Sequence, residues 1–192
     1  MNRSFLRVTL IGLVLLVALA GLAKALGFEI SVSSKPSPSS AATYRDGTCD
    51  RTDSGVTVVV DFGSSSSRTS LIRCVANGAG LTGWQLFEAA GIRVEGTSQY
   101  PSGFVCRVAG WPSVKNQPCT STPTLAQGSW AYFRSSLDQP GWHFALVGAG
   151  TTKPACGQTE GWRFVTTAEA SGGANVGYPE PRFKPVNFKC AQ

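Results

Sequence analysis

Ionisable residues that could carry out catalysis are few and far apart in the chain. His143 is the single histidine, and it stands between two aromatic residues in a segment with strand character. An isolated imidazole is more often a surface residue than a general base, and one histidine cannot supply the usual zinc-binding sets. The acidic residues of the central segments are Asp61, Glu88, Glu95, Asp138 and Glu160. None of them forms a pair with motif spacing, although two carboxylates could still meet in the folded chain. We therefore expect no catalytic residue, no metal site and no enzymatic activity.

The first 25 residues have the pattern of an export segment. A basic start is followed by an uncharged apolar run from Val8 to Ala23. Two small-residue motifs, Ala18-Leu19-Ala20 and Ala23-Lys24-Ala25, suit signal-peptidase cleavage, but about 17 apolar residues can also span a bilayer. We interpret residues 1–25 as a signal peptide or an N-terminal membrane anchor. In both cases the rest of the chain lies outside the cytoplasm, either secreted or anchored to the cell membrane.

Location outside the cytoplasm decides how the cysteines are interpreted. They are Cys49, Cys74, Cys106, Cys119, Cys156 and Cys190. None has C-x-x-C spacing, which argues against zinc binding and thiol redox chemistry, and an even number in an exported domain predicts disulfides. Six cysteines allow 15 pairings. Proximity along the chain favours Cys49–Cys74, Cys106–Cys119 and Cys156–Cys190.

The basic charge of the chain is no indication of nucleic-acid binding. The formal net charge is +6, with 17 basic and 11 acidic residues. Three of the basic residues (Arg3, Arg7 and Lys24) belong to the export segment, so 14 basic residues face the same 11 acidic ones after it. They are dispersed and form no run that would follow a phosphate backbone. We expect no nucleic-acid partner.

The elements that would position these residues follow from hydrophobic patterning. Residues 26–46 form a Ser- and Pro-rich linker, with order expected to begin near Cys49. Strands are predicted at 55–62 and 70–76, 92–100 and 103–112, 129–136, 141–150 and 160–165. The loop 113–127 and the tail 166–192 are expected to be irregular.

One helix is predicted over residues 81–91. Thr82 and Gln85 have the spacing of a capping box, and Leu81 and Leu86 occupy the positions of a hydrophobic staple. Gly91 supplies the left-handed residue that ends a helix. Two strands, one helix and further strands predict an α+β fold, a small β-grasp-like antiparallel or mixed sheet that carries the helix on one face and is stapled by disulfides.

Aromatic residues alternate along the later strands. The alternating sets are Trp130 and Tyr132, Trp142, Phe144 and Leu146, and Trp162 and Phe164. Side chains two apart share a face of a strand, so we expect these sets to meet the helix at Trp84 and Phe87 and form the core. A single helix would leave the second face of the sheet open. Trp111 does not fit the alternation and is expected to be exposed, either as a contact residue or folded onto the surface.

The order of several short motifs resembles a known family. The motifs are the helix with AAG, then YPSGFVCRVAGWP, SWAYF and GAGTTKPACGQTEGWRF. Together they are similar to the C-terminal domain of transcobalamin and intrinsic factor, and especially to an actinobacterial branch of an exported bacterial family of unknown function. The resemblance covers residues 47–165 and leaves 166–192 as a C-terminal tail.

The resemblance implies a binding function rather than a fixed set of contacts. It suggests a non-catalytic ligand-binding module outside the cytoplasm, accessory to uptake of cobalamin, cobalt or another vitamin, with a bound corrinoid or an importer component as partner and no other cofactor. Under that interpretation Trp111, Tyr132, Thr151 and Lys153 would contact the ligand, the last two from the loop 148–153. The alternative is a cell-surface structural or protein-interaction module. An apolar pocket with convergent polar groups would favour the first, and a flat aromatic edge the second.

Overall fold

The computed structural model describes residues 44–170 and 177–191. The predicted signal or anchor segment and most of the predicted linker lie outside the described residues. Within the described ranges, no helix has both the length and the apolar character needed to cross a membrane.

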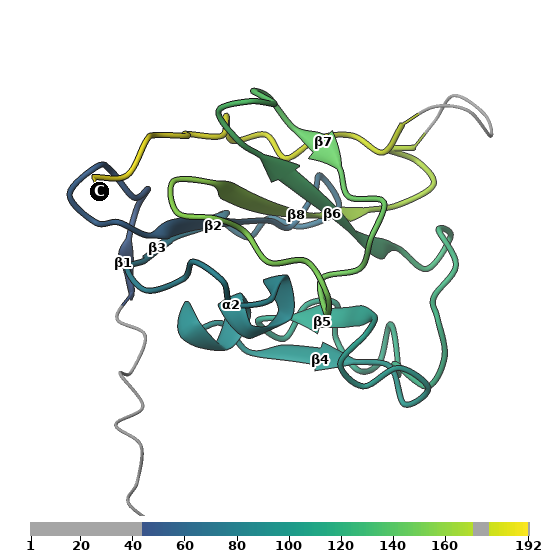
Figure 1. Cartoon of the computed structure of the whole chain (residues 1–192). Coiled ribbons are helices and arrows are strands. Elements are labelled where there is room, and N and C mark those ends of the chain that lie inside the picture. Colours follow the sequence, from purple (N-terminus) through teal and green to yellow (C-terminus); the bar gives the residue numbers. More distant parts are fainter. Residues whose placement is uncertain (1–43, 171–176, 192) are drawn as a thin grey trace, which may run out of the picture. The chain divides into compact units, whose positions relative to one another are not determined.

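A six-stranded mixed sheet is the centre of the domain (Figure 1). Its strands, in spatial order, are β1 (Tyr44–Asp46), β3 (Leu71–Val75), β2 (Val56–Asp61), β8 (Thr159–Val165), β6 (Ser129–Ser135) and β7 (His143–Phe144). The central strands β2 and β8 are parallel, and every other neighbouring pair is antiparallel. A second, two-stranded sheet pairs β4 (Val94–Gly96) with β5 (Val105–Val108). The α+β class and the two predicted hairpins are confirmed.

Strand β1 lies in the last residues assigned to the linker. Tyr44, Arg45 and Asp46 pair with β3, ahead of the expected start of order at Cys49. The ring of Tyr44 lies close against Gly91, and the Asp46 carboxylate pairs with Arg73. These contacts hold the strand at the sheet edge although its sequence is polar.

The helix α2 (Gly83–Ala89) has the ends that the sequence predicts. The Thr82 hydroxyl accepts a hydrogen bond from the Gln85 amide at 3.1 Å, and the Gln85 side chain accepts one from the Thr82 amide at 2.9 Å. Gly91 has φ of 65°, the left-handed conformation that suits glycine after a helix. Leu86 and Phe87 are fully buried against the sheet.

Most of the predicted aromatic core is confirmed on the helix face of the sheet. Trp130 and Tyr132 of β6 and Trp162 and Phe164 of β8 belong to one buried cluster with Phe87. The Tyr132 and Trp162 rings stack at 4.4 Å, and Trp130 meets Phe164 edge-on at 5.4 Å. Helix α2 and the β4–β5 hairpin cover this face together (Figure 1).

The second face of the sheet is not open, contrary to the expectation from sequence. Residues 177–191 run along it on the side opposite α2, as the yellow chain in Figure 1 shows. Thr159 donates a hydrogen bond to the Val186 carbonyl at 2.6 Å, and the Phe188 amide donates one to the Gly157 carbonyl at 3.1 Å. The described part of the predicted tail therefore serves as an irregular strap, named here the C-terminal strap (residues 177–191). With the strap in place, the central strands β2 and β8 are buried on both faces.

The predicted strand 141–150 is reduced to the two residues of β7. Trp142 and Phe144 do share a face, but it is the second face, where both rings meet Phe133 edge-on. Leu146 is 94% exposed and belongs to no strand. The Ala145 amide makes the last hydrogen bond to β6, to the Tyr132 carbonyl at 2.9 Å, and the chain then leaves the sheet. Farther along, the carbonyls of Ala149 and Thr152 accept hydrogen bonds from the first amides of α2.

All three disulfides favoured by proximity are present. Cys49–Cys74 joins the segment before β2 to β3, and Cys106–Cys119 fastens the long loop to β5. Cys156–Cys190 links the start of β8 to the C-terminal strap. Because the third bond spans 34 positions, it closes the longest loop of the three.

Candidate functional site

Three ionisable side chains form a row across β8, β6 and β7. Glu160 pairs with Arg134 in the β6–β8 register, and Arg134 pairs with His143 in the β6–β7 register. Cross-strand partners lie on the same face of a sheet. Glu160 is also opposite Val58, a residue of the helix-face core, so the row lies on the helix face. The row runs from the buried Glu160 to the exposed His143 at the sheet edge.

Glu160 is the buried end of this row. Its side chain is 1% exposed and accepts hydrogen bonds from the Tyr132 hydroxyl and from Arg134 Nε, the latter at 3.1 Å. Burial raises the pKa of the Glu160 carboxyl well above its usual range, because an ionised carboxylate loses its hydration there. The Tyr132 ring is itself fixed by stacking on Trp162. Glu160 is thus a rigid acceptor that orients Arg134.

Arg134 connects this buried group to solvent. Its side chain is 39% exposed, and its Nη2 lies 3.4 Å from the Gln158 side-chain oxygen. Partial burial lowers the pKa of Arg134, although a guanidinium stays charged at neutral pH. Its Nε–H and one Nη2–H are used. For the other three N–H groups, the described residues provide no acceptor.

Two small hollows flank the guanidinium of Arg134. The larger, about 230 Å³, is named here the Arg134 hollow; it is lined by Arg134, Gln139, His143, Phe144, Ala145, Leu146, Val147 and Thr152. The smaller, about 90 Å³, lies against Arg134, Ser135, Ser136, Gln139 and Gln158. No acidic side chain lines either hollow. Arg134 is the one charged side chain that lines both hollows, and its ion-pair partner Glu160 is buried outside them.

Exposed apolar side chains form the rim of the Arg134 hollow. Leu146 is 94% exposed and Val147 59%, in consecutive positions. The base of their loop is held in place. Ala149 is buried, the Ala149 carbonyl accepts from the Trp84 amide at 3.1 Å, and the Thr152 hydroxyl donates to the Gly148 carbonyl at 3.1 Å. An exposed apolar tip on a fixed base is typical of a recognition loop.

The four residues predicted to bind a ligand do not converge on one site. Tyr132 is 6% exposed and belongs to the core, where its hydroxyl bonds to Glu160. Thr151 and Lys153 are exposed and flank Thr152 of the hollow. Trp111 contacts Phe164, with ring centroids 6.0 Å apart.

The expectation that Trp111 is exposed was wrong. Trp111 is partly buried against the helix-face core, and its Nε1 is inaccessible to solvent. Two mutual backbone hydrogen bonds to Val108, both of 2.9 Å, fold the turn back on β5. The left-handed backbone at Ala109 and Gly110 reverses the chain between them. Trp111 is therefore a turn residue folded onto the surface, which is the second of the two roles expected from the sequence.

Sequence reasoning missed Arg134, Gln139 and Val147 and placed Leu146 in a strand. An arginine in the alternating segment SWAYFRSS gives no sign by itself, because its partner Glu160 lies 26 positions away. The usable signal was the pair Leu146–Val147 directly before Gly-Ala-Gly. Two exposed aliphatic residues at the entry to a glycine-containing loop suit a surface contact better than a strand interior.

Two other hollows have different surroundings. One of about 400 Å³ is lined by Trp84, Glu88, Gly91, Ile92, Arg93 and Val94, so its lining contains one acidic and one basic side chain. The other, about 360 Å³, lies between Trp142 and the C-terminal strap. The Trp142 Nε1 donates to the Phe183 carbonyl there at 2.8 Å, so its polar group already holds the strap.

A buried charge cluster elsewhere also fastens the strap. Asp61, at the end of β2, accepts hydrogen bonds from the backbone and side chain of Arg182 at 2.8 and 2.6 Å and from Arg163 at 3.1 Å. Burial alone would raise the pKa of Asp61. The hydrogen bonds from Arg182 and Gly63 and the charge of Arg163 outweigh it and hold the pKa below its usual value. Three residues, Gly63, Arg163 and Arg182, donate hydrogen bonds to this carboxylate and fix it as a structural group.

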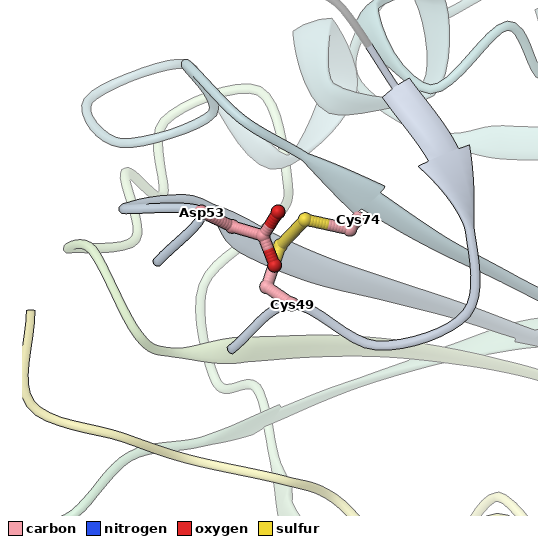
Figure 2. A group of neighbouring side chains, drawn as sticks. All are labelled: Cys49, Asp53 and Cys74. Atoms are coloured by element: carbon pink, nitrogen blue, oxygen red, sulfur yellow. A yellow bond between two sulfur atoms is a disulfide. The ribbon is translucent and has the colours of Figure 1, made fainter. Parts of the chain in front are cut away.

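Cys49, Asp53 and Cys74 come close enough together to suggest a metal site, but their chemistry excludes one. Figure 2 shows the two sulfur atoms joined in a disulfide, beside the Asp53 carboxylate. A disulfide has no thiolate to offer to a metal. The carboxylate is also occupied, since it accepts from Arg45 Nη2 at 2.5 Å and from the Asp50 amide at 2.7 Å.

Comparisons with family models, with curated proteins and with solved structures gave no match for this chain. Its function has to be inferred from its own residues.

Proposed function

We propose that this chain is a non-catalytic binding module that works outside the cytoplasm and recognises a peptide segment of another protein. The exposure of Leu146 and Val147 at the rim of the Arg134 hollow carries the proposal. When a partner covers apolar side chains that are exposed on a fixed loop, the removal of their surface from water favours binding. The Arg134 hollow, at about 230 Å³, is below the 300–1,000 Å³ of typical small-molecule pockets. Its size suits one residue of a longer partner.

The location follows from the disulfides and the N-terminal segment. Three disulfides and no free cysteine among the described residues fit an oxidising environment outside the cytoplasm. We further propose that residues 1–25 export the chain and leave it either secreted or anchored to the membrane. A partner would then be an exported protein or an exposed segment of a membrane protein.

Selection of peptides from a random display library tests this function. The full chain, produced in an oxidising compartment, is the target, and Leu146→Asp is the matched control because it changes only an exposed side chain. We expect peptides that bind the natural chain at micromolar concentration and bind Leu146→Asp at least tenfold more weakly. Failure to enrich any peptide, or equal binding to both proteins, would contradict the proposal.

A corrinoid-uptake role is a second proposal, supported by the family resemblance described above. One structural observation favours it: Thr151 and Lys153, two of the expected contact residues, are exposed beside the Arg134 hollow. The domain would cover one side of the ligand, because a hollow of this size cannot enclose a corrinoid. Titration with cobalamin and cobinamide, followed by visible absorbance, tests it. Saturable binding that Leu146→Asp weakens would support the role, and none at millimolar concentration would exclude it for this chain alone.

We also propose that the fold is of the β-grasp type. The support is the strand order: a β2–β3 hairpin, then helix α2, then the later strand β8 parallel to β2 at the centre of the sheet. An experimental structure that places β8 next to β2 in antiparallel orientation would contradict this assignment.

A further inference from the structure

We propose that the Arg134 hollow binds the C-terminal carboxylate of a partner peptide whose last residue is apolar. This inference rests on the proposed function and names the part of the partner that the site recognises. It needs a cation that is available and held in place, a hollow of suitable size, and an apolar surface next to both.

The available cation is the guanidinium of Arg134. Two of its five N–H groups point to Glu160 and Gln158, and the other three have no acceptor among the described residues. Those three include both N–H groups of Nη1 and one of Nη2. A carboxylate can accept two parallel hydrogen bonds from such a pair of neighbouring nitrogens, which gives both affinity and orientation.

The buried partner of Arg134 holds the guanidinium through Nε and leaves its Nη1 side without an acceptor among the described residues. Glu160 is rigidly placed by the Tyr132 hydroxyl, so Arg134 has little side-chain freedom left to lose on binding. Burial also favours the neutral form of Glu160, since its pKa is raised.

The surroundings of the hollow add to the selectivity for an anion. His143, the cross-strand neighbour of Arg134, is exposed and lines the same hollow with its polar ring. Gln139 and Thr152 offer further polar groups, and the lining contains no carboxylate that would repel a ligand. Asp138 is exposed next to Gln139 but is not part of the lining.

The apolar rim and the size of the hollow indicate a peptide terminus rather than an internal carboxylate. Leu146 and Val147 lie at the same hollow as Arg134, so a ligand whose carboxylate meets the guanidinium can bring an apolar side chain against them. A peptide C-terminus carries both groups on one residue. An Asp or Glu side chain would bring the carboxylate without the apolar group.

Matched acid and amide peptides test the proposal. The peptide that binds best in the display selection is synthesised with its last residue changed to Leu, once with a free carboxylate and once as the carboxamide, and both are titrated by fluorescence polarisation. The carboxamide should bind the natural chain at least tenfold more weakly than the acid. The full chain with Arg134→Gln should bind both forms equally and weakly. Arg93→Gln, the same change at the hollow beside α2, should retain the natural preference.

The outcomes separate this inference from the proposed function. Equal affinity of acid and amide for the natural chain would overturn carboxylate recognition and leave the binding module standing. Failure of every peptide to bind would overturn both. The ratio of the dissociation constants of the carboxamide and the acid is measured on the natural chain. It therefore tests carboxylate recognition even if Arg134→Gln folds poorly.

Discussion

Removal of the Cys156–Cys190 disulfide tests the role of the C-terminal strap. In the chain-entropy description a disulfide stabilises by shortening the loops of the unfolded chain, and a longer loop gives a larger effect. A separation of 34 residues corresponds to about 4 kcal/mol, and the separation of 13 in Cys106–Cys119 to about 3 kcal/mol. Replacing both Cys156 and Cys190 by serine should therefore lower the free energy of unfolding by about 4 kcal/mol.

The packing of the strap adds a local effect that the shorter disulfide does not have. Phe188 is 8% exposed against Cys49 and Cys74, and its amide bonds to the Gly157 carbonyl next to Cys156. Without the bond at Cys190 this end of the strap is held only by such contacts. Hydrogen exchange of the Phe188 amide should become faster, while the Arg182 amide, bonded to the buried Asp61, should stay protected.

Urea unfolding followed by tryptophan fluorescence gives the stability, and exchange measured by mass spectrometry gives the local effect. The matched control is the double serine variant of Cys106 and Cys119, which should lose about 3 kcal/mol and leave Phe188 protected. A smaller loss for the Cys156–Cys190 variant than for the control would refute the loop argument. Unchanged exchange at Phe188 would refute the role of the strap.

Three further substitutions have distinct expected outcomes. Asp61→Asn should cost about 3–5 kcal/mol at neutral pH, because it removes the buried carboxylate that pairs with both Arg163 and Arg182, as urea unfolding would show. The pKa of Asp61 is lower in the folded chain than in the unfolded chain, so its ionised carboxylate contributes stability above the unfolded pKa, and this contribution is lost as pH falls through the folded pKa. The free energy of unfolding of the variant should therefore depend less on pH in acid. The same pH dependence in the natural chain and the variant would count against this role of Asp61. Tyr132→Phe should cost about 1–3 kcal/mol by removing a donor to the buried Glu160, and a neutral result in thermal unfolding would mean that the hydroxyl is not needed there. Leu146→Asp should change the free energy of unfolding by less than about 0.5 kcal/mol, since the side chain is 94% exposed, and a larger loss would show that this residue is structural.

Local signals were sufficient to predict most of the fold. The β-branched run of β2 and the capping residues of α2 act within a few positions, so their effect is visible in the sequence alone. The disulfides followed from proximity because each cysteine pairs with the next one along the chain. Alternation also placed Trp130 and Trp162 in the core correctly.

Long-range pairing explains what could not be predicted. The C-terminal strap is fastened over the second face by the contact between Asp61 and Arg182. These residues are 121 positions apart, so no local sequence pattern predicts their contact. The row of Glu160, Arg134 and His143 depends on the register of three strands. The early end of β7 is not visible in the sequence either, because the apolar alternation continues to Leu146.

Mapping of the binding surface by NMR tests the central claim most directly. A selected peptide is titrated into the full chain, and the backbone and side-chain shifts are followed at the Arg134 hollow, the hollow beside α2 and the hollow beside the C-terminal strap. The account predicts that the largest changes fall on Arg134, His143 and residues 145–147, and that the Leu146→Asp variant shows none. Changes that centre instead on Trp84 and Arg93, or on Trp142 and the C-terminal strap, would contradict it.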